Sequence, residues 1–238
     1  MRIGIHQINF FPWLGYFNKM AKSDLFIYLD RVQLADRGPS QRTFMLENGE
    51  KVTVPVGIKM KGHREKEFRE IELNENSPWK DIFLRFVEKN YSTSEYYDEI
   101  LGEIQKILDS HFTKLMDINM ESIEMTRMLL GISTPIIMQS DIDYDENARK
   151  GDLMMQLTKA VGGDIYLSGT GARAYMDLSV FRNNGIEVQY QTFLPFEYFQ
   201  GNNSFVPGLS ALDAFFHIGH KETKRLFWEN IQNNEIIE

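Results

Sequence analysis

The first 29 residues constrain the fold most, because they alternate between strand and helix patterns. Residues 2–6 and 25–29 are short apolar runs typical of buried strands, and residues 13–22 between them have helical spacing. A helix between two strands allows them to pair in parallel, and parallel sheets are usually covered by helices on both faces. The pattern predicts an α/β fold with a mainly parallel sheet flanked by helices.

The rest of the chain continues this pattern and adds a hairpin and a helical segment. Asn48-Gly49 readily takes the positive φ angles of a hairpin turn between paired strands at 43–47 and 51–56. Residues 77–131 have apolar stripes at helical spacing, so we expect a helical insertion within a single domain, residues 1–238. Further expected strands are 68–73, 134–138, 164–168 and 186–190, and further expected helices are 145–161, 209–218 and 220–232.

The charge of the chain argues against two classes of partner. The chain holds 26 Lys and Arg against 34 Asp and Glu, a net charge of -8 at pH 7. Such a balance attracts neither the phosphates of a nucleic acid nor an anionic membrane surface. A local basic cluster can still bind a small phosphorylated ligand, because a pocket is not governed by the overall sum.

The absence of cysteine excludes several kinds of chemistry. Without thiols there are no disulfides, thiolate nucleophiles or cysteine metal sites, which fits a reducing compartment. The N-terminus lacks the pattern of a secretory signal, and no apolar stretch is long enough for a membrane span, so we expect a cytoplasmic protein. We expect no metal site, since H-E-x-x-H is absent and the acidic run 141–145 lacks the glycine and glutamate of a calcium loop.

Two predicted strands end in polar or glycine residues, at the edge where parallel sheets bind ligands. His6, Gln7 and Asn9 end or follow the first strand, where they either form the rim of a ligand site or merely satisfy backbone groups. Residues 168–173, Ser-Gly-Thr-Gly-Ala-Arg, carry hydroxyl, amide and guanidinium donors suited to phosphate. Because their spacing matches neither the P-loop nor the dinucleotide motif, a simple turn is the alternative.

The segment from His6 to Lys19, HQINFFPWLGYFNK, resembles the opening motif of the WbqC-like protein family, HQPNYLPWLGYFDK. The resemblance continues in DLFIYLDRVQ at 24–33, Arg42, TVPV at 53–56, YLSG at 166–169, YMD at 175–177, FVPGLS at 205–210 and Asp213. It implies a place in the biosynthesis of bacterial surface polysaccharides and nucleotide-activated amino sugars. Ile8 replaces the family's usual proline, and Gly171-Ala172-Arg173 replaces a segment that often ends in Gly-Lys.

A more distant similarity is to nucleotidylyltransferases, including pantothenate-synthetase-like ligases, and it implies a Rossmann-like fold of the nucleotidylyltransferase type. Residues 13–16 occupy the place of their H-x-G-H element and keep the glycine, Gly15, but neither histidine. The similarity implies a nucleotide that lies over Gly15 and against residues 168–173. Large aromatic side chains are expected to anchor the first helix against the sheet: Phe10, Phe11, Trp13 and Phe17.

We therefore expect a transferase or ligase that uses a nucleotide or a nucleotide-activated amino sugar in surface glycan biosynthesis of the O-antigen type. His6 would act as general base, and Lys19 and Arg42 would neutralise phosphate or carboxylate charge. The cofactor is unknown, a nucleotide triphosphate with Mg²⁺ being one option. The expected substrate-binding residues are Gln7, Asn9, Gly15, Tyr16, Asp30, Ser168, Gly169, Thr170, Arg173, Tyr175 and Asp213.

Two other functions fit the same residues. One is acyl or aminoacyl transfer to the amino group of a nucleotide sugar, which needs an activated donor and no nucleotidylyl transfer. The other is a non-catalytic protein that binds a nucleotide sugar and presents it to partner enzymes, because no complete catalytic motif is present. The sequence leaves homo-oligomerisation open.

Overall fold

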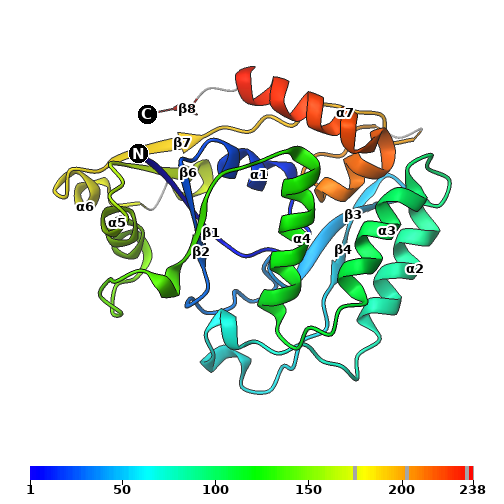
Figure 1. Ribbon diagram of the computed structural model, residues 1–238, viewed down its shortest axis with the longest axis horizontal. Coiled ribbons are helices and arrows are strands. Elements are labelled where there is room, and N and C mark those ends of the chain that lie inside the picture. Colours follow the sequence, from blue (N-terminus) through cyan, green and yellow to red (C-terminus); the bar gives the residue numbers. More distant parts are fainter. Residues whose placement is uncertain (174–175, 202–203, 234–235, 238) are drawn as a thin grey trace.

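A six-stranded sheet runs through the protein (Figure 1). The computed structural model describes residues 1–173, 176–201, 204–233 and 236–237. The strands are β1 (Arg2–Gln7), β2 (Leu25–Leu29), β5 (Ile136–Met138), β6 (Ile165–Gly169), β7 (Glu187–Gln191) and β8 (Ile236–Ile237). Their order is β5-β2-β1-β6-β7-β8, and all neighbours are parallel except β7 with β8. The predicted α/β fold with a mainly parallel sheet is confirmed.

Helices cover both faces of this sheet. Alternate residues of a strand point to opposite faces, so Ile3 and Ile5 of β1 pack toward α5 and α6, whereas Phe26 and Tyr28 of β2 pack toward α1, α4 and α7. In Figure 1, α5 and α6 lie to the left of β1 and β2, and α4 lies to their right. The helices are α1 (Leu14–Ala21), α2 (Trp79–Tyr91), α3 (Tyr97–Leu108), α4 (Leu115–Leu130), α5 (Lys150–Ala160), α6 (Leu178–Arg182) and α7 (Ala211–Asn233).

A separate antiparallel hairpin consists of β3 (Arg42–Glu47) and β4 (Glu50–Pro55). Asn48 and Gly49 have φ angles of 53° and 80°, the pair of positive values that a two-residue hairpin turn of type I′ requires. The predicted hairpin is therefore confirmed. Its inner face packs into the apolar core through Met45 and Val54, which leaves the other face to carry different side chains.

The helical segment 77–131 forms α2, α3 and α4, and its apolar stripes are largely buried, although Ile82 is 50% exposed. Phe83, Val87, Ile100 and Ile104 are fully buried in the same apolar cluster as α1, the hairpin and α7. Figure 1 shows α2 and α3 on the hairpin side of α4, away from α5 and α6. The description of this segment as an insertion within one domain stays a prediction.

The predicted strand at 68–73 is wrong. Phe68–Glu70 is a 3-10 helix closed by a capping box. The Phe68 and Arg69 amides donate to the carbonyls of Val32 and Asp30 at 2.8 and 2.9 Å. These bonds attach the segment to the chain that leaves β2, and only isolated bridges follow in place of a ladder.

One helix start differs from the prediction, and one predicted break within a helical region is confirmed. The helix expected from residue 145 begins at Lys150, because Asp145 closes a turn by accepting the Asn147 amide at 2.9 Å. The two helices expected at 209–218 and 220–232 are confirmed, because α7 is interrupted at Gly219, whose φ of 75° and ψ of 159° are not helical. Neither α6 nor β8 was expected from the sequence.

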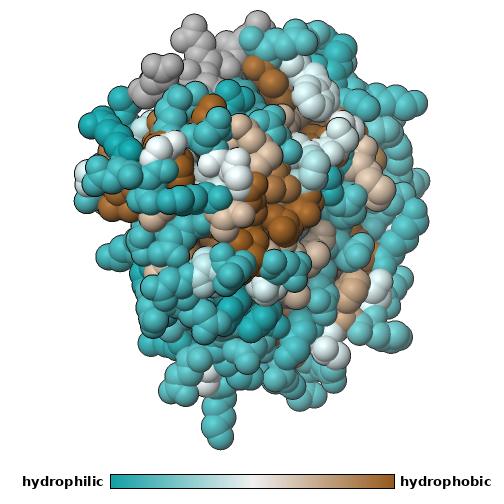
Figure 2. Space-filling model, turned by 60° about the vertical axis from the view of Figure 1, so that its left-hand side comes forward, coloured by the Kyte–Doolittle hydropathy of each residue, from teal (hydrophilic) through white to brown (hydrophobic). Residues whose placement is uncertain are grey.

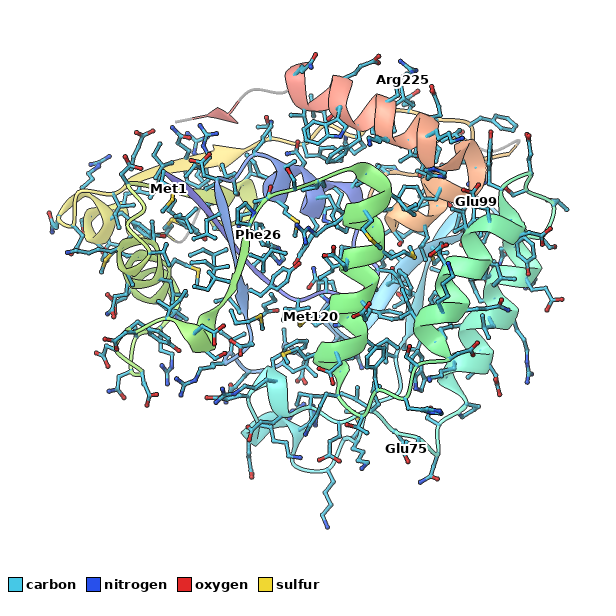
Figure 3. The ribbon with its side chains drawn as sticks, in the orientation of Figure 1. Met1, Phe26, Glu75, Glu99, Met120 and Arg225 are labelled. Carbon is cyan, nitrogen blue, oxygen red and sulfur yellow. The ribbon has the colours of Figure 1, made fainter. Side chains whose placement is uncertain are left out.

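The distribution of side chains is that of an ordinary α/β core. In Figure 3, Phe26 lies in the interior between the sheet and α4, whereas Glu75, Glu99 and Arg225 lie at the periphery. Figure 2 shows a mostly hydrophilic face with hydrophobic side chains gathered near its centre. Within the described ranges, no helix combines the length and the apolar character needed to cross a bilayer.

Candidate functional site

The site lies between β1 and β6, where the strand order of the sheet reverses. From β1 the chain passes through α1 to β2 on one side, and from β6 it passes through α6 to β7 on the other. The connections leaving β1 and β6 therefore diverge at the carboxyl ends of two adjacent strands. In open α/β sheets such a switch point creates the crevice in which ligands bind.

A cleft of about 450 Å³ occupies this switch point, and we call it the switch-point cleft. The structure brings together in its lining many of the residues that the sequence singled out on two distant segments. Those residues are His6, Gln7, Gly15, Tyr16, Lys19, Ser168, Gly169 and Thr170. Parallel pairing of β1 with β6 is the reason, because it puts both strand ends at one edge.

His6 is held in the neutral form within the cleft. Its Nδ1 lies 3.0 Å from the Gln7 carbonyl oxygen, and its ring packs edge-on against Tyr16 with centroids 4.9 Å apart. Burial, followed by the charge of Lys19, lowers the pKa of His6 to about 4. Because a carbonyl can only accept, Nδ1 carries the hydrogen and Nε2 keeps a lone pair. The imidazole can therefore accept a proton from a substrate.

Lys19 lies beneath His6 and is only 3% exposed. Its Nζ donates to the Ile5 carbonyl oxygen at 2.6 Å and lies 5.7 Å from the centroid of the Tyr166 ring. Burial lowers the pKa of Lys19 to about 7, because few partners compensate the lost hydration. The amine therefore changes charge near neutral pH.

Trp13 has a different position from the one expected. Phe10, Phe11 and Phe17 are buried as predicted, but Trp13 is 38% exposed and packs edge-on against Phe193. Its indole lies over Gly15, where a Cβ atom would approach the ring to 2.3 Å. Gly15 therefore makes room for the indole, and both residues line the cleft.

A second hollow of about 290 Å³ adjoins the switch-point cleft, since His6 and Trp13 line both. It contains two more of the predicted residues, Asn9 and Arg42. The Nε atom of Arg42 is buried and makes no hydrogen bond to any described residue. We call this space the hairpin hollow, because the β3–β4 hairpin forms one of its walls.

The loop between β1 and α1 is fixed in a strained conformation. Phe11 has a φ angle of 38°, which is rare for a bulky residue and costs roughly 1–3 kcal/mol. Ser122 Oγ accepts the Phe11 amide at 3.0 Å, and Thr43 Oγ1 and Ser210 Oγ both donate to the Phe11 carbonyl at 2.8 Å. Three distant segments thus hold the loop that separates the two hollows.

The sequence did not single out Gln191 or Phe193, which also line the switch-point cleft. Gln191 Nε2 donates to the Gly15 carbonyl at 3.2 Å, and its Oε1 accepts from Asn18 Nδ2 at 2.6 Å. These bonds join the end of β7 to α1. The available signal was a polar residue directly after the predicted strand 186–190.

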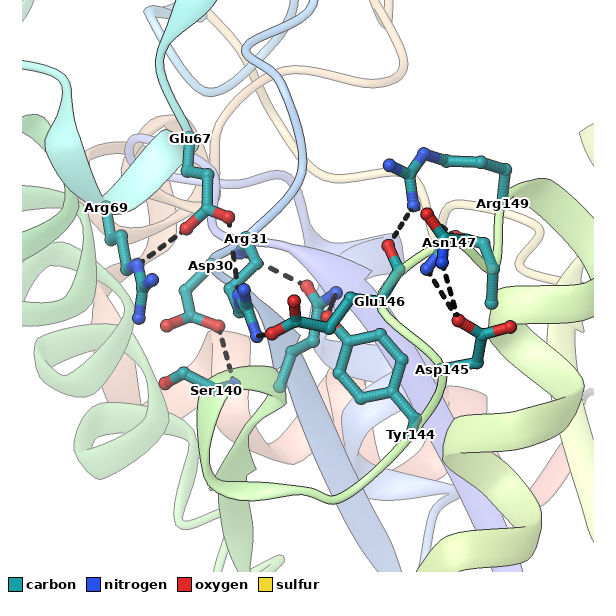
Figure 4. A network of polar contacts seen from close by, with 12 residues as sticks. Asp30, Arg31, Glu67, Arg69, Ser140, Tyr144, Asp145, Glu146, Asn147 and Arg149 are labelled. Carbon is teal, nitrogen blue, oxygen red and sulfur yellow. Dashed lines mark hydrogen bonds and ion pairs between the residues drawn. The ribbon is translucent and has the colours of Figure 1, made fainter.

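Asp30, a predicted substrate-binding residue, supports a neighbouring loop. It is 2% exposed, and its Oδ1 accepts the Ser140 amide at 3.0 Å. Beside it, Arg31 pairs with Glu67 and Glu146 at 3.3 and 2.8 Å (Figure 4). Asp30 lines neither hollow. Its hydrogen bond to the Ser140 amide instead joins the end of β2 to the segment that follows β5.

Two further predicted residues, Arg173 and Asp213, are not brought into the cleft. Arg173 is exposed, and its guanidinium lies 5.4 Å from the centroid of the Tyr190 ring. Asp213 is fully buried elsewhere, where its carboxylate accepts hydrogen bonds from Tyr91, Tyr198 and Gln200. Tyr175 lies outside the described residues.

The two hollows contain cations but no carboxylate among their described lining residues. Across the described residues, no group of three His, Asp or Glu is placed to hold a metal ion. A nucleotide triphosphate with Mg²⁺ would find Lys19, Arg42 and hydroxyl donors for its phosphates. Its metal would have to be carried by the phosphates and water, since Mg²⁺ prefers carboxylate ligands that this lining does not supply.

Comparison with known proteins identifies the family of the chain but no reaction. The chain is 29% identical over 220 residues, 92% of its own length and 94% of the relative's, to the uncharacterized protein Rv1507c of Mycobacterium tuberculosis. No solved structure matches it significantly. The model of the WbqC-like protein family matches residues 7–225, which include both hollows except for Ile5 and His6. The chain belongs to the WbqC-like protein family.

Proposed function

We propose that the chain is a cytoplasmic transferase or ligase that acts on a nucleotide or a nucleotide-activated amino sugar in bacterial surface glycan biosynthesis. The glycan context rests on the family resemblance. The reaction class rests on the switch-point cleft and on the groups that line it.

The observation that carries the proposal is the local charge of the cleft and the adjoining hollow. The whole chain has an excess of Asp and Glu, yet neither cavity is lined by a described acidic residue. Lys19 and Arg42 supply positive charge, and Ser168 and Thr170 supply hydroxyl donors beside it. Such a lining favours an anionic ligand with phosphate or carboxylate groups.

The geometry supports two linked steps. In nucleotidylyl transfer, a carboxylate oxygen would attack the α-phosphorus of a nucleotide triphosphate while the bond to pyrophosphate breaks. In the transfer that follows, an amine would attack the activated carbonyl, the nucleotide monophosphate would leave, and His6 Nε2 would take the amine proton. Lys19 and Arg42 would stabilise the negative charge that each step develops.

Ligand-dependent stabilisation tests the proposal. The chain is heated with ATP, CTP, and UDP-, GDP- and dTDP-sugars in turn, and the midpoint of unfolding is recorded. A ligand at one hundred times its dissociation constant adds about 2.7 kcal/mol to the stability of the folded state. The proposal expects at least one such ligand, with the effect reduced in Lys19→Met. A response to none of these compounds would count against it.

Release of pyrophosphate separates the two enzyme branches. With a competent acid and nucleotide, the ligase branch expects pyrophosphate in proportion to product. Transfer from a preactivated acyl donor to an amino sugar would instead give product without pyrophosphate. Tight binding without turnover, unchanged in His6→Ala, would indicate a binding protein and contradict both branches.

A further inference from the structure

The hairpin hollow contains a cation that the sequence did not single out, Lys51. In the β3–β4 ladder, Phe44 pairs with Thr53, and Lys51 lies two residues along on the same face. Lys51 Nζ lies 4.5 Å from the centroid of the Phe44 ring. Arg42 is two residues before Phe44 and also on this face. The outer face of the hairpin therefore presents two cations to one hollow.

Neither of these cations is neutralised by the described part of the protein. Arg42 and Lys51 take part in no ion pair there, and Arg42 Nε is buried without a hydrogen bond. Partial burial lowers the pKa of Lys51, as expected for an amine that has lost hydration without gaining an anion. A buried donor without a partner is costly, which favours a ligand that supplies an acceptor.

The remaining walls of the hollow are largely apolar. With a volume of about 290 Å³, it lies at the lower end of the range for ligand pockets and suits a small organic molecule. Asn9 contributes its amide at one side, and its Oδ1 accepts from Ser40 Oγ at 3.2 Å. The apolar wall residues are Phe10, Phe11, Pro12, Trp13, Pro39 and Phe44.

We propose that the hairpin hollow is the subsite for a small monocarboxylic acid with an apolar body, whose carboxylate pairs with Arg42 and Lys51. The inference deepens the proposed function, on which it rests, by naming the acid that the nucleotide activates. The planar guanidinium matches a carboxylate in a bidentate pair, and the aromatic walls exclude water from the hydrocarbon part. His6 and Trp13 line both hollows, so the carboxylate would face the nucleotide across the boundary that these two residues share.

The test titrates the full isotope-labelled chain with butanoate, its uncharged isostere butanamide and inorganic phosphate, following backbone amides and the Trp13 indole by NMR. Butanoate is expected to bind and to shift Trp13, with butanamide at least about tenfold weaker, since charge-assisted hydrogen bonds carry the affinity. Arg42→Ala and Lys51→Ala are expected to weaken butanoate about tenfold or more. Lys51→Arg keeps the positive charge and should bind butanoate nearly as well as wild type. A circular dichroism spectrum checks that each variant is folded.

Matched controls remove the same charges elsewhere. Arg85→Ala and Lys61→Ala act on exposed residues outside both hollows and should leave butanoate binding unchanged. Equal binding of butanoate and butanamide, equal loss in the control variants, or tighter Arg42-dependent binding of phosphate would each overturn the proposal. A separate ATP titration of Lys51→Ala reads the switch-point cleft, which Lys51 does not line, and should give the wild-type affinity. Failure of ATP, CTP and all the nucleotide sugars to bind wild type would overturn the proposed function, whereas the butanoate titration would still decide whether the hollow binds a carboxylate.

Discussion

The switch-point cleft and the Asp213 cluster use similar polar residues in opposite ways. The Asp213 carboxylate accepts from Tyr91 Oη, Tyr198 Oη and Gln200 Nε2 at 2.8, 2.6 and 2.9 Å, and the residue is fully buried. In the cleft and the adjoining hollow, cations and hydroxyls face an open space that no described carboxylate enters. One region pairs its donors with a carboxylate of its own, and the other has no described carboxylate to pair with its cations.

This difference distinguishes polar residues that stabilise the fold from polar residues that can bind a ligand. A buried charge whose hydrogen bonds are satisfied within the chain stabilises one packing arrangement, here that of α7 against the hairpin and α2. Donors that remain available at a strand edge contribute little to folding and are useful only to a ligand. The two regions should therefore respond differently to mutation, the first in stability and the second in binding or rate.

Asp213→Ala should give the largest effect on stability. It leaves three buried donors without an acceptor, and the loss of one partner from a buried polar network is worth roughly 3–5 kcal/mol. Urea unfolding at fixed pH measures the change. Asp177→Ala, which removes an exposed helix-capping carboxylate, should cost only about 1 kcal/mol. A loss below about 1 kcal/mol in Asp213→Ala would mean that the cluster does not support the fold.

His6→Ala should show the opposite profile. Loss of a general base reduces a reaction rate by about a hundredfold to ten-thousandfold. The free energy of unfolding should change by less than about 1 kcal/mol, since His6 makes one backbone contact and packs against one ring. The control is His111→Ala, at an exposed position outside the cleft. Full activity in His6→Ala under the conditions of the pyrophosphate assay would remove His6 from the mechanism.

Lys19 should make stability depend on pH. Its pKa is about 7 in the folded chain and 10.5 ordinarily, so between these values the unfolded chain binds the extra proton. Stability contributed by this group therefore rises with pH across that window, by about 1.4 kcal/mol per pH unit. We expect the stability of wild type minus that of Lys19→Met to increase from pH 7 to pH 10. The control pair, wild type and Met60→Ala, differs at an exposed residue and in no titratable group, so its stability difference should be flat.

A flat difference for Lys19→Met would contradict the assignment of a low pKa to this buried amine. His6 adds little slope above pH 7, because burial and then the charge of Lys19 lower its pKa to about 4 from an ordinary value of 6.5, and both values lie below this window.

Gly15→Ala should change the stability least, but it should clearly move the Trp13 indole. Alanine favours a helix over glycine by about 1 kcal/mol, which offsets part of the clash with the Trp13 ring. The indole must move, because the added Cβ would lie 2.3 Å from it. The Trp13 indole resonance should shift while the resonances of Trp79 and Trp228 stay in place. An unshifted Trp13 resonance would show that the ring does not rest on Gly15.

Local sequence patterns predicted the fold well and the site in part. The strand–helix–strand opening and the Asn48-Gly49 turn depend on neighbouring residues, so they could be read directly. The convergence of His6 with Ser168 followed from the rule that parallel strands end at one edge. The prediction was wrong at 68–73, where long-range bonds to the chain after β2 override an apolar run.

The remaining site residues could not be predicted because their positions depend on tertiary packing. Lys51 reaches the site only because the hairpin turns its outer face toward the β1–α1 loop. Asp213 lies in a motif that resembles a functional one, yet Tyr91 and Tyr198 from other elements enclose it. Sequence alone does not distinguish an enclosed carboxylate from an exposed one.

Mapping of a bound nucleotide tests the central claim most directly. The isotope-labelled chain is titrated with ATP, CTP and UDP, and changes in backbone amide resonances are followed residue by residue. The account predicts that the largest changes fall at residues 6–9 and 168–172, at the ends of β1 and β6. Changes centred on the Asp213 cluster, or no saturable change with any of the three, would contradict it.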